Sequence, residues 1–268
     1  MAEMASLSRT HIDEDLKEQL EELSTCEISD ALVKLGNPTG GFLPHLNIYS
    51  PSPIPNDGES GSGREQVKLV GRVFTVRLVE QEKPGAELSN GSKTDQHFVD
   101  AAPEGSVILI SPDFVSGAAC WGGLMSTAAK AKGIKGAVIL GGCRDLVEHR
   151  QLGFPVFAQF HSTIGQKTFL RPSEYDIPLK IPILAQPTLA PRLGDVGHDQ
   201  EDQGERQTVV EPWDVLVGDI DGVVIIPFER LREVIKLAKE GKAVDENIRK
   251  ELELGRGVKE TMKKWRGT

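Results

Sequence analysis

Two glycine-rich junctions carry residue types that could bind a carboxylate and a metal ion. Trp121-Gly122-Gly123-Leu124 opens an expected helix, and the next expected strand ends in Gly141-Gly142-Cys143-Arg144-Asp145. Glycines before a helix expose backbone N–H groups to an anion, and the helix dipole adds partial positive charge there. Arg144 can bind a carboxylate through two parallel hydrogen bonds, and Asp145 can hold a hard divalent cation. Together these residues predict a carboxylate-binding metal site.

The same residues also fit a purely structural interpretation. Asp145 followed by Glu148 has the spacing of a capping box, and Gly142 would then only permit a tight strand-to-helix turn. On spacing alone this structural interpretation is favoured. Cys143 has no His or Cys partner nearby in the sequence, so we expect a buried, inert thiol rather than a nucleophile.

The sequence lacks the local motifs of several enzyme classes. It has no G-x-x-x-x-G-K-[ST], no strand-linked G-x-G-x-x-G, no H-E-x-x-H and no G-x-S-x-G. The six histidines are scattered, and none has metal-ligand spacing from another. Asp219 and Asp221 resemble the start of a calcium loop, but Val223 and Ile225 occupy the next ligand positions. A hairpin at Asp221-Gly222 is therefore favoured.

Length, composition and charge exclude further classes. The chain has 268 residues, 38% of them hydrophobic, which suits a globular domain that needs no disulfides. Lys and Arg number 31 against 40 Asp and Glu, and the net charge of −9 disfavours nucleic-acid and anionic-membrane partners. No apolar run approaches the roughly 20 residues of a membrane span, and the polar start lacks a secretory signal. Three cysteines without a C-x-x-C pair fit reduced thiols. We therefore expect a cytoplasmic protein.

Alternating strand and helix patterns predict the elements that position both junctions. Buried strands are expected at 106–111, 137–140 and 156–159, with helices at 125–132 and 145–152 between them. This βαβ order predicts an α/β fold with a partly parallel central sheet. Ligands tend to bind at the C-terminal edge of such strands, where both junctions lie.

Further elements are expected on either side of this unit. They are an amphipathic helix at 12–23, a second helix opened by the capping box of Ser24 and Glu27, a long strand at 67–80, a short helix from Phe98, a hairpin of 215–217 with 223–226, and helix from 228 to the end. Two polar, aperiodic segments, 44–66 and 194–207, are expected to be loop insertions within a single domain spanning 1–268.

Five segments spread over the chain resemble one known family. They are Ile28-Ser29-Asp30-Ala31-Leu32, Trp121-Gly122-Gly123-Leu124, Gly142-Cys143-Arg144-Asp145, Gly153-Phe154-Pro155-Val156-Phe157-Ala158 and Gly218-Asp219-Ile220-Asp221-Gly222-Val223-Val224. This pattern resembles the RraA-like family, whose catalytic branch contains the class II 4-hydroxy-4-methyl-2-oxoglutarate aldolases. The signature of that branch is a glycine, 20 intervening residues, Arg-Asp, two residues and an acid. Gly123, Arg144, Asp145 and Glu148 fit this signature.

The resemblance implies a fold, a site and a cofactor. The fold would resemble the swivelling β/β/α domains, with flanking N- and C-terminal helices. Arg144 would bind substrate, Asp145 would ligate Mg²⁺, Mn²⁺ or another divalent cation, and Glu148 would be a supporting acid. The backbone that would bind the substrate's pyruvyl carboxylate is that of Gly122, Gly123, Leu124 and Met125. Family members are typically ring-shaped trimers, or hexamers of them, so we expect a homotrimer or hexamer with sites at subunit interfaces.

The chain departs from the family pattern at two places. Many relatives have Asp-Gly where this chain has Gly141-Gly142, and Pro-Gly-Asp where it has Pro212-Trp213-Asp214. Neither change removes an implied ligand. The two insertions could change the entrance of the pocket. The substrate of the family therefore carries over to this chain less readily than the metal site does.

The resemblance implies a divalent-metal-dependent lyase that cleaves a C–C bond of a small 2-oxo acid through a pyruvate enolate. The expected activities are those of a 4-hydroxy-4-methyl-2-oxoglutarate aldolase, an oxaloacetate decarboxylase or both. One alternative is a non-catalytic regulator of the RraA type, which binds and inhibits an RNA-degrading enzyme. Another is a lyase for a larger, specialised substrate. The sequence does not assign the general base.

Overall fold

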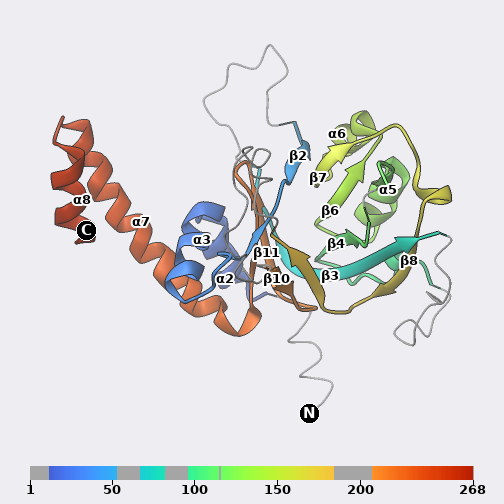
Figure 1. The fold of residues 1–268 in the computed structure, drawn as a ribbon, viewed down its shortest axis with the longest axis horizontal. Helices are drawn as coiled ribbons and strands as arrows, with labels where there is room; N and C mark the ends of the chain where they lie inside the picture. The colour runs from blue at the N-terminus through green and yellow to red at the C-terminus, as the bar shows by residue number, and fades with distance from the viewer. Residues whose placement is uncertain (1–11, 53–66, 82–95, 115, 184–206, 268) are drawn as a thin grey trace, which may run out of the picture.

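A mixed β-sheet forms the centre of the computed structural model, which describes residues 12–52, 67–81, 96–114, 116–183 and 207–267 (Figure 1). Its ten strands are β1 (Phe42–Leu43), β2 (Asn47–Ser50), β3 (Leu69–Glu80), β4 (Ser106–Pro112), β5 (Ala119–Trp121), β6 (Gly136–Cys143), β7 (Val156–His161), β8 (Leu170–Tyr175), β11 (Val215–Asp219) and β12 (Gly222–Ile226). The strand order is β1-β12-β11-β3-β4-β6-β7-β2, with β5 paired to β6 and β8 to β3. A separate antiparallel pair holds β9 (Leu179–Pro182) and β10 (Gln207–Val210).

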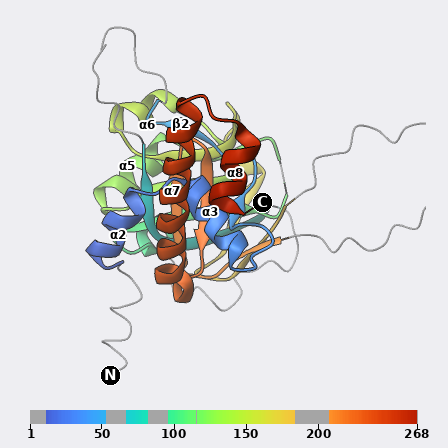
Figure 2. The same cartoon turned by 90° about the vertical axis from the view of Figure 1, so that its left-hand side faces the viewer.

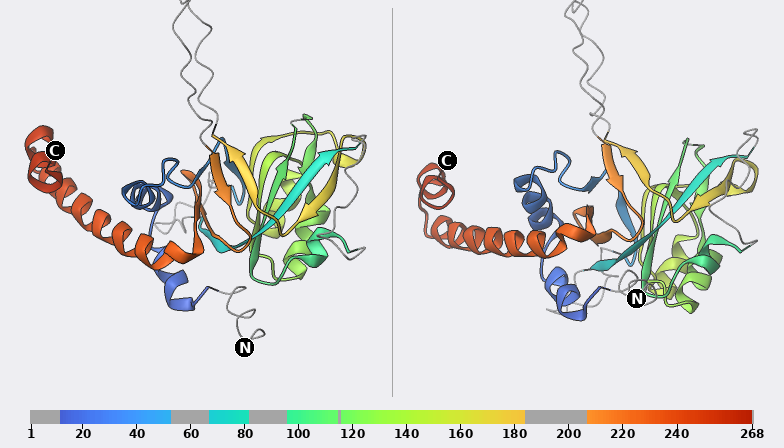
Figure 3. Two further views of the ribbon diagram at one scale, coloured as in Figure 1. Left: turned by 60° about the horizontal axis from the view of Figure 1, so that its bottom comes forward. Right: turned by 90° about the horizontal axis from the view of Figure 1, so that it is seen from below.

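The helices cover two different parts of this sheet. They are α2 (Glu14–Glu21), α3 (Thr25–Lys34), α4 (Phe98–Ala101), α5 (Gly123–Ala131), α6 (Leu146–Leu152), α7 (Leu231–Glu253) and α8 (Val258–Arg266), with short 3-10 turns η1 (Gln166–Thr168) and η2 (Phe228–Arg230). One apolar cluster joins α4, α5 and α6 to β3, β4, β6 and β7, and a second joins α2, α3 and α7 to β11 and β12. Helices α2, α3 and α7 accordingly lie on the opposite side of the molecule from α5 and α6 (Figures 1 and 2). The far end of α7 projects from the body together with α8 (Figure 3).

The parallel part of the sheet contains β3, β4, β6 and β7, as the βαβ pattern predicts, and the short strand β5 pairs with β6 in parallel as well. These strands read as nearly unbroken apolar runs because both of their faces are buried. Their other face packs in a third apolar cluster that includes Leu179, Ile181 and Val210 of β9 and β10. The carboxyl ends of β6 and β7, at Cys143 and His161, are paired and therefore lie at one edge of the sheet.

Several local predictions are confirmed. Ser24 Oγ accepts from the Glu27 N–H at 3.1 Å and the Glu27 carboxylate accepts from the Ser24 N–H at 2.8 Å, which completes the capping box of α3. The β11–β12 hairpin turns between Asp219 and Gly222. The C-terminal segment is helical, with a break between Glu253 and Val258 that separates α7 from α8.

The prediction of a loop at 44–66 is wrong for its first part. Asn47–Ser50 forms β2, an antiparallel edge strand on β7. Edge pairing depends on backbone groups, so this half-exposed strand shows little apolar periodicity. Residues 53–66, and 194–206 of the other expected insertion, lie outside the described residues. No helix in the described part of the chain is long and apolar enough to cross a membrane.

Asp219 is a buried carboxylate that ties helix α3 to the β11–β12 hairpin. It accepts from the N–H and Oγ1 of Thr25 at 2.8 and 2.7 Å, from the Asp221 N–H at 3.0 Å and from Lys68 Nζ at 3.1 Å. Burial opposes the charged form, but the Thr25 bonds and the Lys68 charge outweigh it and lower the pKa of Asp219. The carboxylate is thus committed to the fold, in agreement with the hairpin interpretation of this segment.

We predict that Asp219→Asn lowers stability by about 3 kcal/mol, a fall in Tm of roughly 6–12 °C, because the charged partner of Lys68 is lost. Since the folded pKa of Asp219 is below its unfolded value of about 4, its contribution is present above that pH and is lost as the pH falls through the folded pKa. Thermal unfolding between pH 3 and 7 measures both effects. Asp100→Asn, at an exposed carboxylate, is the control. Equal Tm values for the two variants would contradict the assignment.

Candidate active site at the start of helices α5 and α6

A cleft of about 780 Å³ lies at the carboxyl edge of β5 and β6, where α5 and α6 begin. Six of the seven predicted site residues line it: Gly122, Leu124, Met125, Arg144, Asp145 and Glu148. The seventh, Gly123, is buried beside them. Residues distant in sequence meet here because Trp121 of β5 pairs with Cys143 of β6. The structure therefore brings the whole predicted set to one place.

Asp145 caps α6 with its backbone and not with its side chain. Its φ and ψ of 63° and 43° lie in the left-handed region, and its carboxylate makes no capping hydrogen bond. The predicted capping box is therefore wrong. The carboxylate turns instead toward α5, where the Gly123 N–H donates to Oδ2 at 3.0 Å. A non-glycine residue held in this conformation is strained by about 1–3 kcal/mol, a feature that clusters at functional sites.

Two glycines at the start of α5 make room for the two carboxylates of α6. A Cβ on Gly122 would lie 2.7 Å from Asp145 Oδ2. A Cβ on Gly123 would lie 1.7 Å from Glu148 Oε2 and 2.9 Å from the Glu148 Cβ. At Gly123 the approach to the Glu148 Cβ leaves no room for a side chain, whereas at Gly122 the Asp145 carboxylate would have to move to admit one. The negative carboxylates lie at the N-terminus of α5, where the helix dipole favours them.

Arg144 is held between Asp145 and the segment that follows β7. Its Nε lies 3.5 Å from Asp145 Oδ2, and its side chain is 43% exposed. On the other side, a Cβ on Gly165 would come within 2.7 Å of Arg144 Nη1. The Ile164 carbonyl, which accepts from the Ala119 N–H at 2.8 Å, fixes that segment against β5. Arg144 therefore presents its guanidinium to the cleft from a defined position.

The remaining polar groups suit an anion and a hard cation. Asp145 Oδ1 and the Leu124 N–H make no hydrogen bond within the described part of the chain. The described residues contain no group of three or more His, Cys, Asp and Glu side chains that could enclose a metal. Mg²⁺ and Mn²⁺ commonly use one or two carboxylates and keep water or substrate oxygens as other ligands. The donor set of Asp145 and Glu148 fits these ions and does not fit a structural zinc site.

The two cysteines near the cleft are inert at neutral pH. Burial raises the pKa of the Cys143 thiol to about 12 and that of Cys120 to about 11. The expectation that Cys143 is a buried thiol is confirmed, and its raised pKa disfavours a nucleophilic role.

Some residues at the cleft were not found by sequence reasoning. Gln166 and Lys167 of η1 line it, but no motif connects this turn to Arg144. Ser126 and His149 lie beneath it, fully buried. The two residues have equivalent positions, because each stands four residues after the N-cap of its helix, Gly122 for α5 and Asp145 for α6. Such spacing places both residues one turn inside their helices.

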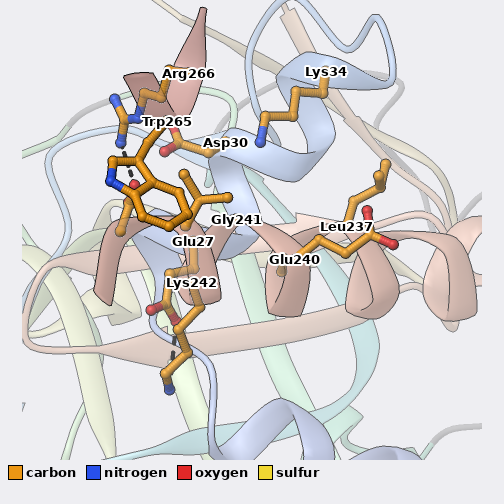
Figure 4. Close-up of a pocket in the computed structure, with 12 residues that line it drawn as sticks. Glu27, Asp30, Lys34, Leu237, Glu240, Gly241, Lys242, Trp265 and Arg266 are labelled. Carbon is orange, nitrogen blue, oxygen red and sulfur yellow. Dashed lines mark hydrogen bonds and ion pairs between the residues drawn. The ribbon is translucent and has the colours of Figure 1, made fainter. Parts of the chain in front are cut away.

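A second hollow lies between α3, α7 and α8, on another part of the molecule (Figure 4). Four of its charged side chains form two ion pairs: Arg266 Nη2 lies 2.6 Å from Asp245 Oδ1 and Lys242 Nζ lies 4.0 Å from Glu27 Oε2. None of the predicted site residues lines it.

The structure thus combines a mixed α/β fold with a cleft that is bounded by glycines. A sequence model of the RraA-like family, described as Aldolase/RraA, matches residues 25–225. The chain belongs to the RraA-like family.

Three relatives extend this likeness. A protein of Halalkalibacterium halodurans, provisionally named 4-hydroxy-4-methyl-2-oxoglutarate aldolase, is 28% identical over 87% of this chain and 86% of its own length. Protein DlpA of Legionella pneumophila is 25% identical over 88% of this chain, and an uncharacterized protein of Methanocaldococcus jannaschii is 35% identical over 54%. The matched region spans only 31% of DlpA and 57% of the Methanocaldococcus protein.

Solved structures show the same fold. An uncharacterized protein from Pseudomonas syringae has a TM-score of 0.69 at 24% identity, with 96% of each chain covered. RraAS2 of Streptomyces coelicolor, described as an unusual member of the RNase ES inhibitor RraA family, has a TM-score of 0.62 at 19% identity, covering 88% of this chain and 96% of its own.

We predict that Gly123→Ala destabilises the protein by about 1–3 kcal/mol, although alanine is normally the better helix residue by about 1 kcal/mol. The cause is the collision of the new Cβ with Glu148. Glu148→Ala alone should change stability by less than about 0.5 kcal/mol, and the double variant should recover much of the loss. Denaturant unfolding of the four proteins completes the cycle.

Gly257→Ala is the matched control, because its φ is −66° and no atom lies within 4 Å of the added Cβ. Strict additivity of Gly123→Ala and Glu148→Ala would show that the two residues do not pack together.

Proposed function

We propose that this protein is a divalent-metal-dependent lyase that cleaves a C–C bond of 2-oxo acids and releases pyruvate. The expected substrates are 4-hydroxy-4-methyl-2-oxoglutarate and oxaloacetate. The observation that carries the proposal is the joint placement of the Asp145 carboxylate, the Arg144 guanidinium and the free Leu124 N–H in one cleft. The aldolase name of the Halalkalibacterium relative supports the same class of reaction.

The chain's own residues would bind and orient the substrate. Arg144 and the Leu124 N–H donate to the carboxylate beside the keto group, because both donors border the same cleft. Asp145 Oδ1 and Glu148 would hold the divalent cation. When bound, that cation supplies positive charge next to the keto oxygen, where negative charge develops as the C–C bond breaks.

The two reactions differ in their need for a base. Retro-aldol cleavage removes the proton of the 4-hydroxyl, breaks the C3–C4 bond and leaves its electron pair on C3 of pyruvate, which then takes up a proton. Decarboxylation of oxaloacetate breaks the bond to the leaving carboxylate, releases CO₂ and needs no such base. One site that stabilises the pyruvate fragment can therefore serve both reactions.

Lys167 supports a substrate with two carboxylates. It is exposed, lines the cleft and makes no ion pair within the described residues. The two cations Arg144 and Lys167 balance the two anions Asp145 and Glu148, so a bound divalent cation leaves a surplus of two positive charges. A dicarboxylate neutralises that surplus. We infer that Lys167 binds the carboxylate distant from the keto group.

Three expectations belong to this proposal as predictions. They are a single domain spanning 1–268, a homotrimer or hexamer with sites at subunit interfaces, and a cytoplasmic location. Light scattering of the purified chain tests the assembly directly.

We predict that the protein releases pyruvate from oxaloacetate and from 4-hydroxy-4-methyl-2-oxoglutarate with Mg²⁺ or Mn²⁺, and that excess EDTA abolishes the release. Asp145→Asn should lower kcat/KM on the order of 100-fold or more, since it removes the charged ligand. Asp30→Asn, at an exposed carboxylate, should have no effect. A coupled lactate dehydrogenase assay measures the pyruvate.

Activity that survives EDTA, or that survives Asp145→Asn, would contradict the metal assignment. A folded wild-type protein that turns over neither substrate would contradict the proposed lyase. That result would favour the regulatory alternative or a specialised substrate.

For Lys167→Ala we expect KM for both dicarboxylates to rise about tenfold, with little change in kcat, because one charged hydrogen bond is lost. Lys180→Ala on β9, also exposed, is the control and should leave KM unchanged. Steady-state kinetics of the two variants provides the comparison. An unchanged KM in Lys167→Ala would refute the role of this lysine.

A further inference from the structure

A chain of buried hydrogen bonds lies directly beneath the candidate site. Trp121 Nε1 donates to Ser126 Oγ at 2.8 Å, and Ser126 Oγ lies 2.9 Å from His149 Nδ1. Trp121 is 1% exposed, and Ser126 and His149 are 0% exposed. These residues belong to β5, α5 and α6, the three elements that meet at the cleft.

The chemistry of the three groups sets the direction of the first hydrogen bond. An indole N–H can only donate, so Ser126 Oγ accepts from Trp121. The hydroxyl keeps a second lone pair and its own proton, so it pairs with His149 Nδ1 in either tautomer of the neutral ring. Burial lowers the pKa of His149, which keeps the ring neutral.

The His149 ring also lies near the backbone that carries the site. The backbone carbonyl of Arg144 is close enough to raise the pKa of the ring against the effect of burial. His149 Nε2 is buried and has no hydrogen-bond partner among the described residues. The ring is thus beside the peptide link between Arg144 and Asp145, the residue with left-handed backbone.

Helices α5 and α6 are therefore joined at two levels. At the cleft, the Gly123 N–H donates to Asp145 Oδ2. One turn further in, Ser126 and His149 repeat the connection at equivalent positions of the two helices. With only the outer contact, α6 could rotate relative to α5 and carry Asp145 and Glu148 away from the glycines.

We propose that His149, held by Ser126 and Trp121, is a positioning residue that fixes the Arg144-Asp145 link and so sets the cation-binding geometry of Asp145. This inference rests on the proposed function. Stability alone does not account for the arrangement, because a buried polar ring with an unpartnered nitrogen stabilises a core less than an apolar side chain of similar size. Groups that support a metal ligand from behind commonly tune its affinity.

The test compares three variants by Mn²⁺ affinity, by kcat and KM, and by Tm. His149→Leu should keep or raise Tm, yet weaken Mn²⁺ binding and lower kcat by about tenfold or more. His149→Asn should restore both, because its amide group can hydrogen-bond to Ser126 at the place of Nδ1, either as acceptor or as donor. Ser126→Ala should weaken Mn²⁺ binding like His149→Leu. Mn²⁺ binding is measured on the full chain by electron paramagnetic resonance.

Ser106→Ala is the matched control. Ser106 is also fully buried and donates to the Pro103 carbonyl at 2.6 Å, but it lies on β4 and does not line the cleft. This variant should lose stability and keep its Mn²⁺ affinity.

The outcomes separate this inference from the proposed function. If the wild type binds Mn²⁺ and releases pyruvate but His149→Leu and Ser126→Ala bind Mn²⁺ as tightly as the wild type, the positioning role is refuted alone. The same holds if His149→Asn behaves like His149→Leu. If His149→Leu does not fold, the contrast between Ser126→Ala and Ser106→Ala decides. A wild type without Mn²⁺ binding or turnover refutes both the proposed function and this inference.

Discussion

The rest of the site depends on the close approach of two carboxylates to the glycine backbone at the start of α5. Without side chains at Gly122 and Gly123, Asp145 and Glu148 can lie directly on that helix terminus. The helix dipole favours carboxylates there by about 0.3–1 kcal/mol each, and the Gly123 N–H adds a charged hydrogen bond. These gains offset the left-handed backbone of Asp145, which costs about 1–3 kcal/mol.

The pairing of two strands in the sheet explains how the two carboxylates come to lie against the start of α5. Strands β5 and β6 are parallel neighbours, and the Arg144 N–H donates to the Trp121 carbonyl at 3.0 Å as the two strands end. The two helices therefore start side by side, and the 20 residues between Gly123 and Arg144 are those of one helix and the next strand. The spacing between Gly123 and Arg144 therefore equals the length of helix α5, the turn after it and strand β6. The cleft at this point presents one guanidinium and two carboxylates.

Much of this arrangement could be predicted from the sequence, and the exceptions share a physical cause. The βαβ order, the Ser24–Glu27 capping box and the Asp219–Gly222 hairpin depend on neighbours in the chain, and all are confirmed. The capping box at Asp145 failed because the competing donor, the Gly123 N–H, is 22 residues away. Strand β2 and the position of Lys167 at the cleft were missed for the same reason: each depends on contacts with residues distant in the sequence.

Asp145, Glu148, Arg144 and the α5 terminus are together proposed to form one site for a divalent cation and a 2-oxo acid. The most direct measurement is a titration of the full chain with Mn²⁺ by electron paramagnetic resonance, with and without oxalate, a planar dianion shaped like the pyruvate enolate. One Mn²⁺ should bind per chain, and more tightly when oxalate is present, because Arg144 and the Leu124 N–H would hold the anion beside the cation. Mn²⁺ binding that is absent, or that oxalate leaves unchanged, would contradict it.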